Sequence, residues 1–223
     1  MRRKKPIYIF TFHGLGTPEG QLADGEEDYW LDPSFFEAIL DRVKDREDVY
    51  ITFDDCNSSD FHIALPLLTK RNLGAAFFVV SDRIDLDGFM TSEQVRELVR
   101  AGMTIGSHGT RHRRWATLRA ADLNEELHAS RSTLESVVRQ TVSEAACPFG
   151  SYNRRVLLAL RAAGYTRVYT SDQGPADEHE WLSARNTIVR SHTMRYVEAV
   201  LESPPRRVRG LLRTLKLTLK RLR

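Results

Sequence analysis

Short runs of apolar and β-branched residues alternate with helical patterns along most of this 223-residue chain. Most of these runs are continuous in such residues and are not interrupted by polar ones, which is typical of parallel strands covered on both faces. We therefore predict seven strands, at residues 7–12, 49–53, 75–80, 103–106, 145–147, 167–170 and 187–190.

The segments between the predicted strands carry signals for the start and end of helices. Asp32-Pro33 supplies an N-cap and a first-turn proline, and 91–94 is a capping box before a helix that Gly102 closes. Further helices are predicted to begin at Asp122 and Asn153. This alternation predicts right-handed crossovers and a parallel sheet. About seven such units in roughly 205 residues favour a distorted barrel, in which the chemistry belongs to the loops after the strands.

Composition excludes several classes of protein. With 41% hydrophobic and 28% charged residues the chain is globular, which argues against wholesale disorder and a fibrous repeat. No run of about 18 apolar residues is present that would span a bilayer. The basic start is followed by an apolar stretch that stops at Thr11 and His13 without a cleavage site. We therefore expect no signal peptide and a cytoplasmic protein.

The net charge of +3 is distributed unevenly. Eight Lys or Arg residues and no acids lie between 206 and 223, and removing their +8 from +3 leaves −5 for the first 205 residues. The acidic body and the basic tail therefore need separate explanations. Ser203-Pro204-Pro205 ends a predicted domain at 1–203 and introduces a tail at 204–223.

In the tail, apolar residues recur at helical spacing, at Val208, Leu211, Leu212, Leu215, Leu219 and Leu222. This pattern predicts a basic amphipathic helix. Such a helix would pack on the barrel or on another subunit, or attach through 206–223 to an anionic membrane at its inner face. Nucleic acid is not expected as a partner, because neither an aromatic platform nor a basic body accompanies the tail.

The polar residues that stand out lie at predicted strand ends. Asp54-Asp55 follows the second strand, and His108 and His112 follow the fourth. Two histidines four residues apart can bind one metal ion, and with one carboxylate they leave open positions for a reactive water. The second carboxylate is then free to act as a base. Each pair taken alone is better explained as a solvated turn, a helix cap or a packed histidine. Their occurrence together at equivalent strand ends favours the metal site.

A third motif, Pro148-Phe149-Gly150-Ser151-Tyr152, follows the fifth strand. It is either an ordinary loop or a rigid wall that presents a backbone N–H to a reacting carbonyl. This motif, together with 52–55 (Thr-Phe-Asp-Asp) and 107–112 (Ser-His-Gly-Thr-Arg-His), resembles the first three motifs of the polysaccharide deacetylase family, the NodB-homology domain of carbohydrate esterase family 4. The resemblance covers roughly residues 7–192 and implies an α/β fold, a distorted (β/α)7 barrel.

The resemblance implies a metal-dependent reaction. Asp55, His108 and His112 would bind a divalent metal, zinc by default, although iron, cobalt or nickel would also suit this ligand set. Asp54 would be the general base. The implied reaction is hydrolysis of an N-acetyl group on an amino sugar, in a polysaccharide or a lipid-linked glycan precursor.

The resemblance also implies a role for the third motif. The backbone N–H of Phe149 would hold the oxyanion together with the metal, and Pro148, Gly150 and Tyr152 would complete the substrate site.

Two departures concern the proton-transfer groups. The arginine that orients the base in many family members is replaced by Ala146, which leaves Arg111, Arg154 and Arg185 as candidates for that role. This departure keeps open one alternative, a hydrolase of another non-peptide C–N bond. A degenerate barrel that binds glycan without turnover is a separate alternative.

The second departure is the missing histidine on the predicted last strand. We expect His13, which follows the first strand, to act as general acid, with His192 as second choice. The position of His13 resembles that in family members whose last motif is circularly permuted to the N-terminus. A histidine held by a loop carbonyl is the structural alternative. A further difference is Cys56, where many members carry glycine. We interpret Cys56 and Cys147 as buried thiols rather than a redox pair or an extra ligand.

Overall fold

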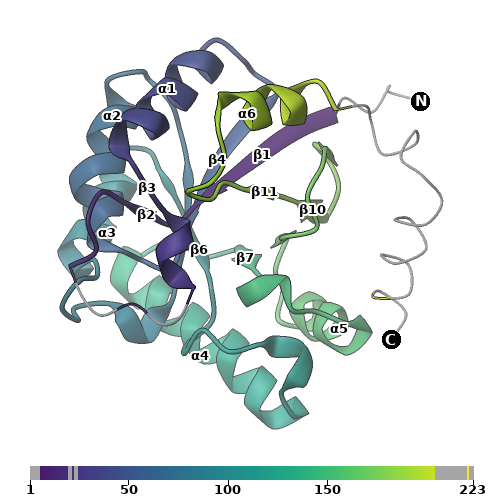
Figure 1. The fold of residues 1–223 in the computed structure, drawn as a ribbon. Coiled ribbons are helices and arrows are strands. Elements are labelled where there is room, and N and C mark those ends of the chain that lie inside the picture. Colours follow the sequence, from purple (N-terminus) through teal and green to yellow (C-terminus); the bar gives the residue numbers. More distant parts are fainter. Residues whose placement is uncertain (1–5, 20–21, 23–24, 204–219, 221–223) are drawn as a thin grey trace.

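The structure is a computed structural model that describes residues 6–19, 22, 25–203 and 220. In this part of the chain a mostly parallel sheet curves into a nearly closed barrel with helices outside it (Figure 1). The sheet order is β10-β8-β7-β6-β5-β4-β1-β11, and β9 adds to β1 as an antiparallel strand. The sheet strands are β1 Pro6–Phe12, β4 Val49–Asp54, β5 Ala76–Val79, β6 Thr104–Ser107, β7 Glu144–Ala146, β8 Arg167–Thr170, β9 Ala176–Asp177, β10 Leu182–Ala184 and β11 Asn186–Thr187.

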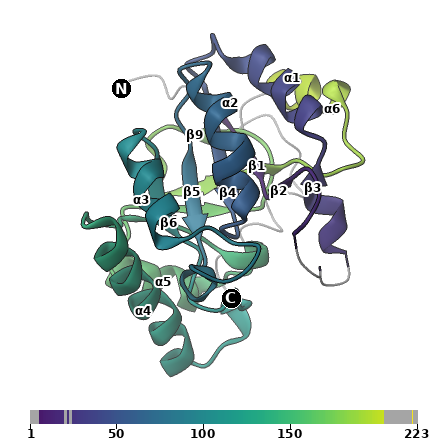
Figure 2. The same ribbon diagram turned by 90° about the vertical axis from the view of Figure 1, so that its left-hand side faces the viewer.

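Three helices begin at the predicted capping residues, whereas the helix predicted to begin at Asp122 begins at Ala120, with Arg119 at its N-cap and Asp122 in its first turn. Asp32 Oδ1 accepts a 2.7 Å hydrogen bond from the backbone of Ser34, and the Thr91/Gln94 capping box is formed. Asn153 caps the helix that follows it. The helices, which cover the outside of the strands in Figure 2, are α1 Pro33–Val43, α2 Leu65–Thr69, α3 Ser92–Arg100, α4 Ala120–Val138, α5 Arg154–Ala162 and α6 Met194–Leu201.

Side-chain alternation along the strands separates the outer core from the barrel interior. On β1, Phe10 and Phe12 belong to the large core between strands and helices, whereas Ile7 and Ile9 belong to a smaller cluster with Phe78. In the outer core Phe53 and Phe77 are stacked, with ring centroids 4.8 Å apart. Such aromatic pairs contribute roughly 0.5–1.5 kcal/mol beyond burial of their area.

One short segment nearly closes the barrel. β10 pairs with β8 and β11 pairs with β1, and only Arg185 separates these two strands in the sequence. The predicted strand at 187–190 is therefore wrong in its bounds. The backbone N–H of Ile188 still donates to the Thr11 carbonyl of β1, but that of Arg190 donates to the Asp28 carbonyl, so the chain has left the sheet by this residue.

A small parallel pair lies outside the barrel, between β1 and α1. β2 (Gly14–Leu15) pairs with β3 (Trp30–Leu31). A Cβ on Gly14 would lie 2.2 Å from the Trp30 ring, so only glycine lets the indole pack there. The pair connects the end of β1 to a wall of the cavity described below.

The basic amphipathic helix predicted for the tail lies outside the described residues, except for Lys220. The Nζ of Lys220 donates to the Gly150 carbonyl at 2.8 Å and to Asp172 at 3.0 Å, so the chain contacts the barrel at this point. Within the described part of the chain, no helix combines the length and apolarity that a membrane crossing requires.

Candidate metal centre and catalytic pocket

The ends of β4 and β6 bring the acidic pair and the histidines together. Phe53 belongs to the outer core, so alternation directs the next side chain, Asp54, into the barrel, where it is buried. Asp55 then leaves the strand with a φ of 84°. His112 has a φ of 52°, so both loops adopt a conformation that is costly for non-glycine residues.

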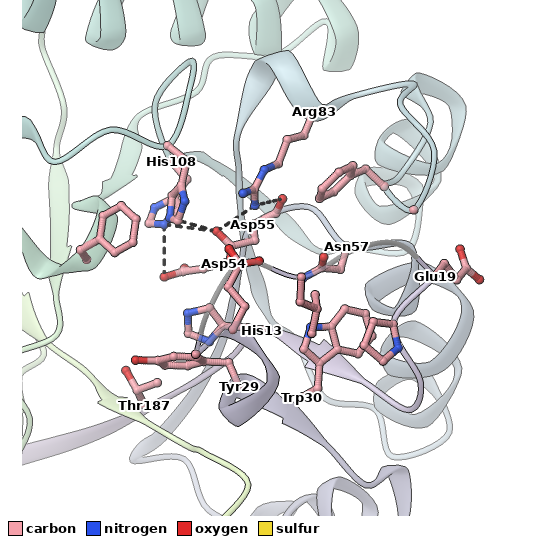
Figure 3. A pocket seen from close by; sticks show the side chains of 18 of the residues that line it. His13, Glu19, Tyr29, Trp30, Asp54, Asp55, Asn57, Arg83, His108 and Thr187 are labelled. Atoms are coloured by element: carbon pink, nitrogen blue, oxygen red, sulfur yellow. Dashed lines mark hydrogen bonds and ion pairs between the residues drawn. The ribbon is translucent and has the colours of Figure 1, made fainter.

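Asp55, His108 and His112 form one cluster, in which the potential ligand atoms all lie within 4.8 Å of one another. The Asp55 Oδ1 is 3.2 Å from His112 Nε2 and 3.8 Å from His108 Nε2. These residues come from two loops that are far apart in the sequence, and the structure brings all three together. Figure 3 shows His108 directed toward both Asp54 and Asp55.

The donor set fits a divalent cation. The Nδ1–H of His108 donates to the Ala146 carbonyl at 2.9 Å, which leaves the Nε2 lone pair facing the carboxylates. Among the described residues, the buried Oδ1 of Asp55 has no hydrogen-bond partner. One carboxylate and two imidazoles suit zinc and the other borderline metals.

Burial keeps both imidazoles neutral, as ligands must be. It lowers the pKa of His108 despite the opposing charges of Asp54 and Asp55, and it lowers the pKa of His112 to about 4. Because a neutral ring carries a free lone pair, protons do not compete for these nitrogens near neutral pH.

Arg185 is the partner of Asp54. Its Nη1 and Nη2 donate to Oδ1 and Oδ2 of Asp54 at 2.7 and 2.6 Å, and both side chains are buried. Burial alone would raise the pKa of Asp54, but Arg185 and then His108 outweigh it and hold the pKa well below its usual value. Of the three arginines considered as replacements for an arginine at Ala146, the structure thus places Arg185 on the carboxylate.

A second arginine, Arg83, lies beside the candidate metal ligand. Its Nη1 is 3.3 Å from Asp55 Oδ1, and the guanidinium packs over the Phe89 ring. Burial would raise the pKa of Asp55, but its interactions with the neighbouring histidines, His112 first, and with Arg83 hold it below its usual value. Sequence patterns gave no signal for Arg83.

The two histidines considered as general acid lie in different places. His13 lines the same cavity as Asp54 and Asp55, with its ring 4.8 Å from that of Tyr29. Its Nδ1 is buried and has no hydrogen-bond partner among the described residues. His192 lines a separate cavity and does not reach this one.

The third motif contributes Phe149 to the cavity. Phe149 is 50% exposed, and its ring lies 4.3 Å from that of His112 and 4.3 Å from the Arg114 guanidinium. Pro148 and Gly150 are buried beneath it and do not line the cavity. Tyr152 is also outside the cavity, where its hydroxyl donates to Asp172 at 2.5 Å.

Both cysteines are buried free thiols. Burial raises the pKa of Cys147 to about 12 and raises that of Cys56 further. Neither lines the cavity. Cys56 has a φ of 73°, a left-handed conformation that explains why glycine suits this position.

Glu126 of α4 supports the histidine loop. Its Oε2 accepts hydrogen bonds from the backbone N–H groups of Thr110 at 2.9 Å and Arg111 at 3.3 Å, and the residue is buried. This carboxylate therefore fixes the backbone between His108 and His112. Sequence reasoning missed it, because a single glutamate within an amphipathic helix carries no signal.

The cavity above these residues has a volume of about 620 Å³. Figure 3 shows the histidines and aspartates on one side of it and Trp30 and Glu19 on the other. Its lining mixes acids, arginines, histidines and aromatic rings, a combination that suits a polar ligand with apolar faces.

The nearly closed barrel has the NodB-type fold, and the site lies in its catalytic position only as a candidate. The sequence model of the polysaccharide deacetylase family matches residues 41–168, more than half of the chain, and the chain belongs to that family. YxkH of Bacillus subtilis (strain 168), whose name assigns it to the polysaccharide deacetylases, is 26% identical over 148 residues, 66% of this chain and 53% of YxkH. The chain spans about half the length of the curated relatives it matches.

Solved structures of such deacetylases share the fold. The deacetylase PplD of Streptococcus pyogenes, in complex with acetate, has a TM-score of 0.78 and 20% identity, covering 90% of this chain and 100% of PplD. BC0361, a polysaccharide deacetylase from Bacillus cereus, has a TM-score of 0.78 and 19% identity, covering 89% of this chain and 70% of BC0361. The predicted distorted barrel of the NodB type is confirmed.

Proposed function

We propose that this protein is a metal-dependent hydrolase that removes the N-acetyl group from an amino sugar within a polysaccharide or a lipid-linked glycan precursor. The observation that carries the proposal is the convergence of Asp55, His108 and His112 on one point, with the buried carboxylate of Asp54 beside them. A divalent metal held there, most simply zinc, would act as a Lewis acid on the amide and acidify an attacking water.

Asp54 is the proposed general base. Its Oδ2 lies 3.7 Å from His108 Nε2, so it borders the point where the ligand atoms converge. Arg185 keeps the carboxylate ionised, and an ionised carboxylate can accept a proton from the attacking water.

His13 is the proposed general acid, which donates a proton to the amine nitrogen as the acetyl group leaves. The backbone N–H of Phe149 would stabilise the oxyanion, an effect worth roughly 3–4 kcal/mol per donor. The exposed Phe149 ring, with Arg114 behind it, would contact the acetylated sugar.

The experiment measures the metal content of the purified chain and then acetate release from N-acetylglucosamine oligomers. Asp54→Asn is expected to abolish acetate release with metal still bound, whereas His108→Ala loses both. Full activity in Asp54→Asn would refute the mechanism.

The same experiment tests the two alternatives. A hydrolase of another C–N bond would bind metal and release no acetate, and a degenerate glycan-binding barrel would have no turnover at all. The first rested on the missing arginine at Ala146, and Arg185 now supplies that charge to Asp54.

We also propose that 1–203 is the catalytic domain and that 206–223 can attach a cytoplasmic enzyme to an anionic membrane. The support is the sequence pattern of the tail. Flotation with anionic vesicles tests it, because equal distribution of the full chain and a chain ending at Ser203 would refute it.

A further inference from the structure

The turn that carries Phe149 adopts a costly backbone conformation. Phe149 has a φ of 56° and a ψ of 17°, and Gly150 after it has a φ of 59°. A bulky residue in the left-handed region persists only when its surroundings hold it there. Within the turn, the Gly150 N–H donates to the Cys147 carbonyl at 2.9 Å. The Ser151 N–H donates to the Pro148 carbonyl, also at 2.9 Å. These two bonds tie the turn to itself and not to the rest of the barrel.

The chain after β8 packs against this turn. A Cβ on Gly150 would lie 3.0 Å from the Cβ of Ser171, so the two segments approach each other closely. Ser171 and Phe149 both line the catalytic pocket. The contact between the two segments therefore helps to fix the position of the Phe149 backbone N–H, the proposed oxyanion donor.

Asp172, the residue after Ser171, places a buried carboxylate beside this contact. Its side chain is 6% exposed, and its Oδ2 accepts hydrogen bonds from the Tyr152 hydroxyl at 2.5 Å and the Thr170 hydroxyl at 3.0 Å. Burial would raise the pKa of Asp172, but the Tyr152 hydroxyl and then Lys220 outweigh it and hold the pKa below its usual value. Asp172 is therefore ionised at neutral pH, and a buried carboxylate in this form favours a cation next to it.

Lys220 of the C-terminal tail supplies such a cation. Its Nζ donates to Asp172 Oδ1 at 3.0 Å and to the Gly150 carbonyl at 2.8 Å. The same ammonium group lies 4.0 Å from the centre of the Tyr152 ring, a distance typical of a cation–π contact. A hydrogen bond between an ammonium and a carboxylate is roughly twice as strong as one between neutral groups. One lysine thus joins the turn that carries Phe149 to the chain after β8.

We propose that Lys220 is a positioning residue for the reaction. It holds the Gly150 carbonyl, and with it the neighbouring Phe149 N–H, in the orientation that the oxyanion requires. This inference rests on the proposed function. It makes turnover depend on the contact of Lys220 with the barrel, and it gives Tyr152 and Asp172, which do not line the catalytic pocket, a role in that contact.

The test compares Lys220→Met with the parent chain. Met retains an apolar stem over Tyr152 but removes the ammonium group and its two hydrogen bonds. Because the oxyanion forms only in the transition state, kcat for acetate release from N-acetylglucosamine oligomers should fall about tenfold, whereas KM should change by less than about twofold. The expected loss is smaller than the roughly 10²–10³ that removal of an oxyanion donor costs, because the Phe149 N–H is still present. Lys220→Arg keeps the charge and the donors and should recover most of the parental kcat.

The control is Lys44→Met, which removes an exposed lysine at the end of α1 that does not line the catalytic pocket. It should leave kcat unchanged. Asp172→Asn keeps an acceptor for the Tyr152 hydroxyl but removes the charge that binds Lys220, so it should also lower kcat. The double variant should lose little more than either single variant, because both substitutions disrupt one contact. If the parent releases acetate and Lys220→Met has the parental kcat, the inference is overturned and the proposed function stands.

Amide hydrogen exchange measured by NMR tests the contact without turnover. The N–H groups of Gly150 and Ser151 close the turn, so their exchange should be about tenfold faster in Lys220→Met than in the parent and unchanged in Lys44→Met. Equal exchange rates in Lys220→Met and the parent overturn the inference whether or not acetate is released. If the parent releases no acetate, the proposed function fails, and faster exchange in Lys220→Met still supports the hold of Lys220 on the turn.

Discussion

Removing the guanidinium of Arg185 tests the central electrostatic argument. Arg185→Met keeps much of the side-chain volume but takes two hydrogen bonds, at 2.7 and 2.6 Å, away from a carboxylate that is only 4% exposed. Breaking a buried ion pair from one side costs roughly 3–5 kcal/mol. For a domain of this size that corresponds to a loss of about 6–20 °C in Tm.

The same substitution changes the pH dependence of the reaction in a defined direction. With Arg185 present the pKa of Asp54 is held low, so the base is ionised at all pH values of interest. Without it, burial dominates and the pKa rises, so the acidic limb of the kcat/KM profile moves to higher pH. Activity at neutral pH falls and partly recovers as the pH is raised.

Thermal unfolding and pH–rate profiles of acetate release measure the two effects. The double variant Arg185→Met/Asp54→Asn removes both charges and should regain most of the lost Tm while staying inactive. Arg111→Met is the control, because Arg111 pairs with the exposed acids Asp82 and Glu125 away from the base. If Arg185→Met keeps the parental Tm and acidic limb, the assignment of this ion pair is wrong.

Three further predictions concern the histidine loop. Glu126→Ala should weaken zinc binding at least tenfold in a competition titration, since the Thr110 amide loses its acceptor. The control is Glu125→Ala, which changes an exposed residue, and equal zinc affinities of the two variants would contradict this role. Gly109→Ala should lower the free energy of unfolding by about 1–3 kcal/mol in denaturant titrations, because Gly109 has a φ of 82° and a Cβ would lie 2.6 Å from Glu126 Oε2; an unchanged midpoint would exclude this clash. In the metal-free protein, NMR should show His112 taking up its proton near pH 4. Because the unfolded chain binds this proton at higher pH, the free energy of unfolding should decrease as the pH falls from about 6.5 towards 4. Protonation near pH 6.5 would refute the buried position.

The sequence was sufficient for features that depend on local pattern. Continuous apolar runs identified β1, β4 and β8 closely, because strands covered on both faces need apolar residues at every position. Helix caps such as Asp32 bond to residues within one helical turn, so the sequence predicted them equally well. The convergence of Asp55, His108 and His112 was predictable because Asp55 follows one strand end and the histidines follow another.

Features that depend on how distant segments meet were not predictable. Arg185 was one of three arginines considered as the partner of Asp54. It lies between β10, which pairs with β8, and β11, which pairs with β1, and this position directs its side chain at Asp54. The strand at 187–190 was misplaced for the same reason, since the apolar residues Ile188 and Val189 lie in an irregular segment after β11. Arg83 and Glu126 act through individual contacts that produce no recognisable pattern in the sequence.

Arg185 lies between β10 and β11, where the barrel nearly closes. The proposed reaction therefore depends on the docking of these last strands. A chain whose last strands have not yet docked would have the proposed base, Asp54, and the proposed metal ligands at the ends of strands already in place, but no Arg185 beside Asp54. Such a partly folded molecule could collect metal and still leave acetylated sugars untouched. Turnover would therefore report the final docking step of folding, whereas metal uptake would report an earlier one.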